Sequence, residues 1–197
     1  MPTESLFFDP LDPELKIKIE GLAKVPGICI FVDITGSMNM KSRGLKHWAV
    51  MIHNCFANAR TYLPTDFSPV RAIGDALMFY IQESELKQSG YTCMQVYDGL
   101  WQFVRDRGSD FPEVKVGAVW CEDAYPLTFF RGGRDYYGLD IDLAARLQAK
   151  ASSREIVIDQ RFRDRVMADA AGAGNRDQFV SVALIGTRTG GSERAGQ

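Results

Sequence analysis

Cysteine and histidine are scarce in this chain of 197 residues, which contains four cysteines and two histidines. The cysteines form no C-x-x-C pair, and the two histidines offer them little help in building a zinc site. We therefore expect the cysteines to be reduced core residues of a cytoplasmic protein. They are Cys29, Cys55, Cys93 and Cys121.

A long apolar run and an excess of charge of one sign are also missing. No apolar stretch approaches the ~20 residues of a membrane-spanning helix, and residues 1–5 lack the basic start of a secretory signal. The chain has 23 basic and 25 acidic side chains, so we expect no broad cationic surface for nucleic acid or membranes. These absences favour a soluble, intracellular protein with a small, specific ligand.

Hydrophobic side chains make up 46% of the chain, enough for the core of one domain. Near the N-terminus, two Asp-Pro pairs interrupt regular structure and an alternating stretch follows at 16–20, so residues 1–24 are expected to be an arm or an edge strand. Residues 186–197 have no apolar spacing and are expected to be a flexible tail. The domain then spans 25–185.

The hydrophobic pattern predicts an α+β sandwich. Apolar runs or alternation predict strands, helical spacing predicts helices, and Gly74-Asp75 predicts the turn of a hairpin. The expected strands are 28–32, the two halves of 69–82, 114–120, 155–158 and 179–184, and the expected helices are 45–63, a segment covering 94–104, one after Gly138 and one near 161–167. This order favours a ferredoxin-like, mostly antiparallel sheet with helices on one face.

Two aspartates lie where this fold would bring them together. Asp33 follows the strand at 28–32, and Asp75 occupies the hairpin tip. Either alone would suit an ordinary turn, but the pair in these positions favours a site for divalent metal ions. Gly36 and Ser37 then lead into a helical region whose free backbone N–H groups would cradle the phosphates of a nucleoside triphosphate.

Three motifs resemble those of the class III nucleotide cyclases. They are Phe31-Val32-Asp33-Ile34-Thr35-Gly36-Ser37, then Ile73-Gly74-Asp75-Ala76, then Asp135-Tyr136-Tyr137-Gly138 leading into Asp142-Leu143-Ala144-Ala145-Arg146-Leu147. The resemblance implies that 25–185 form a cyclase catalytic domain that works as a homodimer, with sites across the interface. It also implies that Asp33, Asp75 and the carbonyl of Ile34 hold two Mn²⁺ or Mg²⁺ ions.

The resemblance assigns the remaining candidates to substrate recognition. Asp135 and Arg71 occupy base-reading positions, and Asp142 and Arg146 occupy the ribose-orienting and transition-state positions. Because Asp142 and Arg146 are four residues apart on a helix, the alternative for them is an ordinary surface salt bridge.

Two departures from the family pattern bear on the substrate. Arg71 replaces a base-reading Lys and makes adenine a poorer choice, because a planar guanidinium reaches further into the pocket than an ammonium does. Asp142 replaces an Asn and lacks its amide donor, which puts its inherited role in question. A carboxylate and a guanidinium suit uracil, with cytosine as the alternative. The chain thus looks similar to the pyrimidine cyclases of the bacterial anti-phage systems called Pycsar, which implies UTP as substrate and a separate effector activated by the cyclic nucleotide.

Two other interpretations stay open at this point. Asp33-Ile34-Thr35-Gly36-Ser37 also fits the metal-adhesion motif of a von Willebrand A domain, which would be a doubly wound parallel sheet with a binding function. That interpretation leaves the second and third motifs unexplained. The second interpretation is a catalytically inactive, cyclase-like dimer with a regulatory role. The presence of both metal-binding aspartates argues against it.

Overall fold

The computed structural model describes residues 4–42, 44–63, 69–105 and 112–172. Its main feature is a five-stranded sheet with the strand order β3-β4-β2-β5-β7. The strands are β2 (Gly27–Ile34), β3 (Pro69–Ile73), β4 (Ala76–Gln82), β5 (Val114–Cys121) and β7 (Ile156–Ile158). Three of the pairings are antiparallel and only β5 with β7 is parallel. The mostly antiparallel sheet confirms the α+β prediction and excludes the doubly wound parallel sheet of the adhesion-domain alternative.

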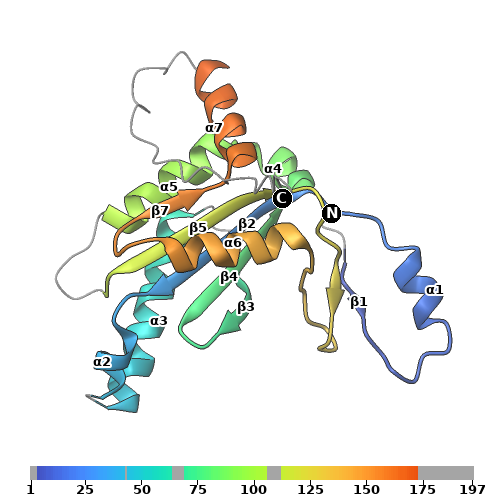
Figure 1. Ribbon diagram of the computed structural model, residues 1–197, viewed down its shortest axis with the longest axis horizontal. Helices are drawn as coiled ribbons and strands as arrows, with labels where there is room; N and C mark the ends of the chain where they lie inside the picture. Colours follow the sequence, from blue (N-terminus) through green and yellow to red (C-terminus); the bar gives the residue numbers. More distant parts are fainter. Residues whose placement is uncertain (1–3, 43, 64–68, 106–111, 173–197) are drawn as a thin grey trace, which may run out of the picture.

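Helices cover both faces of this sheet (Figure 1). One face packs against α3 (Leu45–Tyr62), α4 (Glu83–Ser89), α5 (Cys93–Arg105) and α7 (Gln160–Gly172). The other face packs against α6 (Leu139–Lys150). The expectation of helices on one face was therefore wrong. The physical reason is that β2 and β4 bury apolar side chains on both sides, so each side needs a cover.

Contact between α6 and the sheet is close because β5 has a glycine beneath the helix. A Cβ atom on Gly117 would lie 2.4 Å from both the Ala144 carbonyl oxygen and the Gln148 backbone nitrogen. Only a residue without a side chain lets the helix backbone rest here. The position of α6, and of every functional side chain on it, thus depends on Gly117.

The N-terminal segment differs from its prediction. The alternating stretch at 16–20 belongs to a helix, α1 (Leu15–Glu20), so the edge strand that was one of the two expectations for it was wrong. Local bonding explains the helix, because the Asp12 side chain accepts hydrogen bonds from the Glu14 backbone N–H at 2.9 Å and from Lys18 Nζ at 2.7 Å. Before it, β1 (Leu6–Phe7) pairs in parallel with β6 (Leu127–Thr128), beside the main sheet (Figure 1).

Most of the other predicted elements are confirmed. The hairpin turns at Gly74-Asp75, and α7 extends the helix expected near 161–167. The short helix α2 (Ser37–Lys41) follows Gly36. The strand expected at 179–184 lies outside the described residues. Within the described ranges, no helix combines the length and the apolar character needed to cross a membrane.

Candidate active site

Asp33 and Asp75 lie next to each other at one end of the sheet. Asp33 is the penultimate residue of β2 and pairs in register with Ala76 of β4, which directly follows Asp75. Gly74 has a φ of 62°, a left-handed conformation that closes the tight turn between β3 and β4. The fold therefore brings the two predicted metal-binding aspartates together, although they are 42 positions apart in the sequence.

Donors surround both carboxylates. Gln148 Nε2 donates a hydrogen bond to Asp33 Oδ2 at 2.9 Å, and Lys115 Nζ lies 3.5 Å from the same oxygen. At Asp75, Lys41 Nζ lies 4.0 Å from Oδ1. Each carboxylate thus already faces a cation of the chain itself. Sequence reasoning missed these three donors, because each comes from an element whose position depends on the tertiary fold.

The chemistry of this donor set fits hard divalent cations. Across the described residues, no group of three or more His, Cys, Asp or Glu side chains forms a ready cluster for a metal ion. The predicted ligands are the carboxylates of Asp33 and Asp75 and the backbone carbonyl of Ile34, the last implied by the resemblance. Such a small set of oxygen ligands suits Mg²⁺ or Mn²⁺ ions that take their other ligands from water and substrate phosphates. Gly36, with a φ of 72°, then turns the chain into α2 at Ser37.

Arg71 and Asp135, the two predicted base-reading residues, form an ion pair with each other. Arg71 Nη2 and Nε donate to Asp135 Oδ2 at 2.7 Å and 2.9 Å, and Nε also lies 3.1 Å from Oδ1. The guanidinium also lies 4.6 Å from the ring centre of Tyr137 and 3.3 Å from the carbonyl of Tyr136. Asp135 is only 5% exposed. The prediction had both groups facing a base, whereas in the structure most of the Asp135 carboxylate is used to hold Arg71.

Tyr136, next to this pair, is held by a second buried network. Its hydroxyl accepts hydrogen bonds from Gln82 Nε2 at 2.8 Å and Arg134 Nε at 2.5 Å, and Arg134 also bonds Glu85 at 2.6 Å. Burial raises the pKa of Tyr136 despite the opposing effect of these donors, so the hydroxyl stays protonated. The ring stacks on Tyr80 of β4, with 4.0 Å between ring centres. These contacts fix the segment that carries Asp135.

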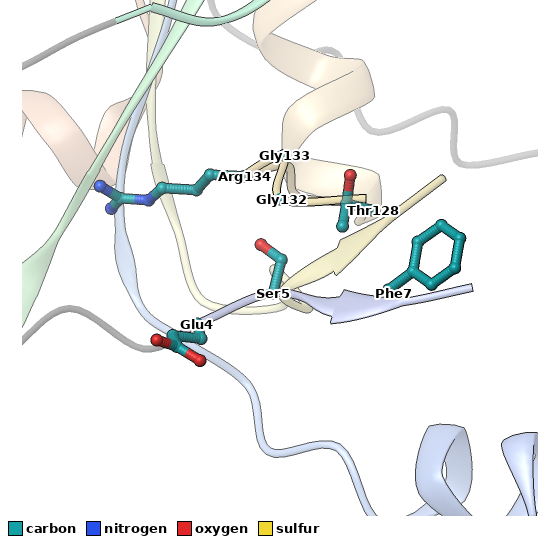
Figure 2. Close-up of a pocket in the computed structure, with 7 residues that line it drawn as sticks. All are labelled: Glu4, Ser5, Phe7, Thr128, Gly132, Gly133 and Arg134. Atoms are coloured by element: carbon teal, nitrogen blue, oxygen red, sulfur yellow. The ribbon is translucent and has the colours of Figure 1, made fainter. Parts of the chain in front are cut away.

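The N-terminal segment also contacts Asp135. The Ser5 hydroxyl donates to the Asp135 carbonyl at 2.9 Å and lies 3.1 Å from the Asp135 backbone nitrogen. Ser5 is one of the residues that line a pocket of about 390 Å³ between β1 and the loop that precedes Asp135, and Figure 2 shows these residues. A second pocket, of about 430 Å³, lies between α3 and the β3–β4 hairpin. Neither pocket is lined by a predicted site residue.

Asp142 and Arg146 lie on the exposed face of α6, away from the sheet. Neither forms an ion pair within the described part of the chain, so the surface salt bridge considered for them is not formed. The opposite face of α6 is buried, at Ile141, Ala144, Leu147 and Gln148. Within one chain the structure does not bring Asp142 and Arg146 to Asp33 and Asp75.

Comparison with solved structures identifies the fold. The adenylyl cyclase CyaB from P. aeruginosa matches with a TM-score of 0.62 and 12% identity, over 75% of this chain and 82% of that chain. A guanylyl cyclase domain of the RhoGC fusion protein from the fungus Blastocladiella emersonii matches with a TM-score of 0.59 and 13% identity, over 73% and 84% of the two chains. The guanylate cyclase domain of RhGC from Catenaria anguillulae, in complex with GTP, matches with a TM-score of 0.55 and 14% identity, over 76% of this chain and 85% of that chain.

No protein-family model and no curated protein matches this sequence. At these identities the similarity concerns the fold. The chain has the fold of nucleotide cyclase catalytic domains.

Proposed function

We propose that this chain is a nucleotide cyclase that converts UTP to 3′,5′-cyclic UMP and pyrophosphate. The observation that carries the proposal is the juxtaposition of Asp33 and Asp75 at the end of β2 and the tip of the β3–β4 hairpin, within a fold shared with adenylyl and guanylyl cyclases. Paired carboxylates at a sheet end suit metal-assisted phosphoryl transfer better than they suit simple binding.

Asp33, Asp75 and the carbonyl of Ile34 would hold two Mn²⁺ or Mg²⁺ ions. Bound there, the ions would activate the ribose 3′-hydroxyl for in-line attack on the α-phosphorus and neutralise charge on the departing pyrophosphate. The backbone N–H groups of Gly36 and Ser37 would bind the β- and γ-phosphates. Lys41 and Lys115, which face the two carboxylates here, supply further positive charge for the triphosphate.

A second copy of the chain would complete each site. The side chains of Asp142 and Arg146 are exposed and form no ion pair with the residues that the structure describes, which favours this arrangement because it leaves them available to a partner. Arg146 would stabilise the charge that develops on the α-phosphate, and Asp142 would contact the ribose. Because each chain would complete the site of its partner, the homodimer would have two equivalent sites.

The fixed guanidinium of Arg71 favours a base with a carbonyl oxygen. Asp135 and Tyr137 hold Arg71 through Nε, Nη2 and the guanidinium face, which leaves Nη1 to donate to the base. Uracil would accept at a carbonyl oxygen, and its N3–H would donate to Asp135 Oδ1 in place of the 3.1 Å bond from Arg71 Nε, so UTP is the favoured substrate. Cytosine presents a carbonyl and an amino group to the same pair, and CTP is the alternative, followed by a purine triphosphate. Adenine has no carbonyl oxygen and fits worst.

The departures at Arg71 and Asp142 that resemble the Pycsar pyrimidine cyclases support a cellular role. In that role the chain would make a second messenger in the cytoplasm during phage infection. A separate effector protein would bind the cyclic nucleotide. The trigger would be a component of the infecting phage.

One experiment tests the proposal directly. Purified protein is incubated with Mn²⁺ and each of ATP, GTP, CTP and UTP, and the products are identified by mass spectrometry, with Asp75→Ala as the inactive control. Cyclic UMP is the expected product. Cyclic CMP, AMP or GMP would keep the cyclase and overturn the choice of base. No cyclic product from any triphosphate would overturn the proposed activity.

A further inference from the structure

We infer that Gln148 is a positioning residue for the proposed metal site, where its side-chain amide orients the carboxylate of Asp33. The inference rests on the proposed function, because it concerns a carboxylate that would bind metal. Gln148 is one of four buried polar or charged side chains in the described residues and is 8% exposed. A buried amide needs hydrogen-bond partners, and here Nε2 donates to Asp33 Oδ2 at 2.9 Å.

The packing of α6 on the sheet fixes the Gln148 backbone. Gly117 of β5 lies directly beneath it, where a Cβ atom would be 2.4 Å from the Gln148 nitrogen and 2.8 Å from its Cα. Gly117 pairs in register with Phe31, which lies two residues before Asp33 on the same face of β2. The Gln148 side chain therefore reaches Asp33 from a helix that is in contact with the sheet, and its amide is held in place.

The Gln148 amide is neutral, so its effect on Asp33 differs from that of a cationic side chain. Lys115 is opposite Asp33 in register, and its Nζ lies 3.5 Å from the same Oδ2 that Gln148 bonds. With the amide in place, this oxygen is oriented by a group that adds no charge. Without the amide, the existing ion pair between Lys115 and Asp33 would tighten, and an entering metal ion would have to displace the ammonium from this oxygen. Gln148 thus keeps Asp33 available to a divalent cation.

Binding of Mn²⁺ to the whole chain, without nucleotide, tests this role. Free Mn²⁺ is measured by electron paramagnetic resonance as protein is titrated into the metal. Outer partners of metal-binding carboxylates typically contribute about 10- to 100-fold in affinity, so we expect Gln148→Met to weaken Mn²⁺ binding about tenfold. Gln148→Asn keeps a buried amide that is one methylene too short to reach Asp33, and it should weaken binding in the same direction.

Gln160→Met is the matched control. Gln160 makes the same kind of bond, from Nε2 to Asp164 Oδ1 at 2.7 Å, but it is exposed at the start of α7. Its replacement should leave Mn²⁺ affinity unchanged. Adding Lys115→Met to Gln148→Met should restore part of the lost affinity, because the competing ammonium is then gone.

The outcomes separate this inference from the proposed function. Mn²⁺ affinity equal to that of the unaltered chain, in either folded Gln148 variant, would overturn the positioning role and leave the proposed cyclase intact. A lowered melting temperature with unchanged Mn²⁺ affinity would do the same, since it indicates a purely structural residue. If the unaltered chain shows no saturable Mn²⁺ binding that Asp33→Asn removes, both the inference and the proposed metal site are wrong.

Discussion

Replacement of Asp135 by alanine should destabilise the free protein, even though the residue is proposed to read a base. Asp135 is 5% exposed and accepts hydrogen bonds from Arg71 and from the backbone N–H of Tyr136 at 2.8 Å. Breaking a buried ion pair can cost about 3 to 5 kcal/mol. The Arg71 side chain is 27% exposed and regains water, so we expect a loss nearer 2 to 3 kcal/mol, roughly that of one hydrogen bond to a charged group.

For a chain of this length, that loss lowers the melting temperature by about 4 to 12 °C. The assay is thermal unfolding followed by circular dichroism, without nucleotide or metal. Asp142→Ala is the matched control, because that carboxylate is exposed and unpaired in the described residues, so its loss should stay within about 0.5 kcal/mol. If the melting temperature of Asp135→Ala equals that of Asp142→Ala and of the unaltered chain, the ion pair with Arg71 does not hold this segment in the free protein.

Three further predictions concern the site and its supporting helix. Asp33→Ala or Asp75→Ala should each abolish cyclisation while the circular dichroism spectrum is retained, and cyclic product from either variant would refute the two-metal assignment. Arg146→Ala should lower kcat by about 10² to 10³ with little change in KM, because it removes a donor needed mainly in the transition state; an unfolded variant would instead show that Arg146 is structural. Gly117→Ala should lower the free energy of unfolding by about 1 to 3 kcal/mol in urea, because its Cβ would lie 2.4 Å from the Ala144 carbonyl, and an unchanged midpoint would contradict that packing.

Local sequence signals predicted that Asp33 and Asp75 would meet at one end of the sheet. A buried strand ending in Asp33 and a Gly-Asp turn before Ala76 define the register of two adjacent strands, so the proximity of Asp33 and Asp75 follows from short segments. The same signals located α3, β5 and α6 to within a few residues. The unbroken apolar run of β2 is also typical of a strand that is buried on both faces, as the structure shows.

Local sequence signals could not predict the contacts between segments that are distant in the sequence. Arg71 and Asp135 are 64 positions apart, and only the assembled fold shows that they bind each other. Ser5 contacts Asp135 across 130 positions, from a segment that the sequence pattern described as an arm. The helix at 16–20 was missed because the hydrogen bonds of Asp12 favour a helical turn over the strand that alternation alone predicts. In each case a side-chain contact, and not the periodicity, decides the structure.

The helix α6 connects the two halves of the proposed site. Its inner face places Gln148 on Asp33 of the same chain, while its outer face presents Asp142 and Arg146 to the solvent. In the proposed homodimer, one rigid helix would then orient a metal-binding carboxylate of its own site and supply transition-state contacts to the partner's site. Because Gly117 holds the helix backbone directly on β5, a displacement of α6 at the dimer interface cannot be absorbed by side chains between helix and sheet. Dimer assembly and metal binding should therefore be energetically coupled, and by linkage Mn²⁺ should favour the dimer as much as the dimer favours Mn²⁺.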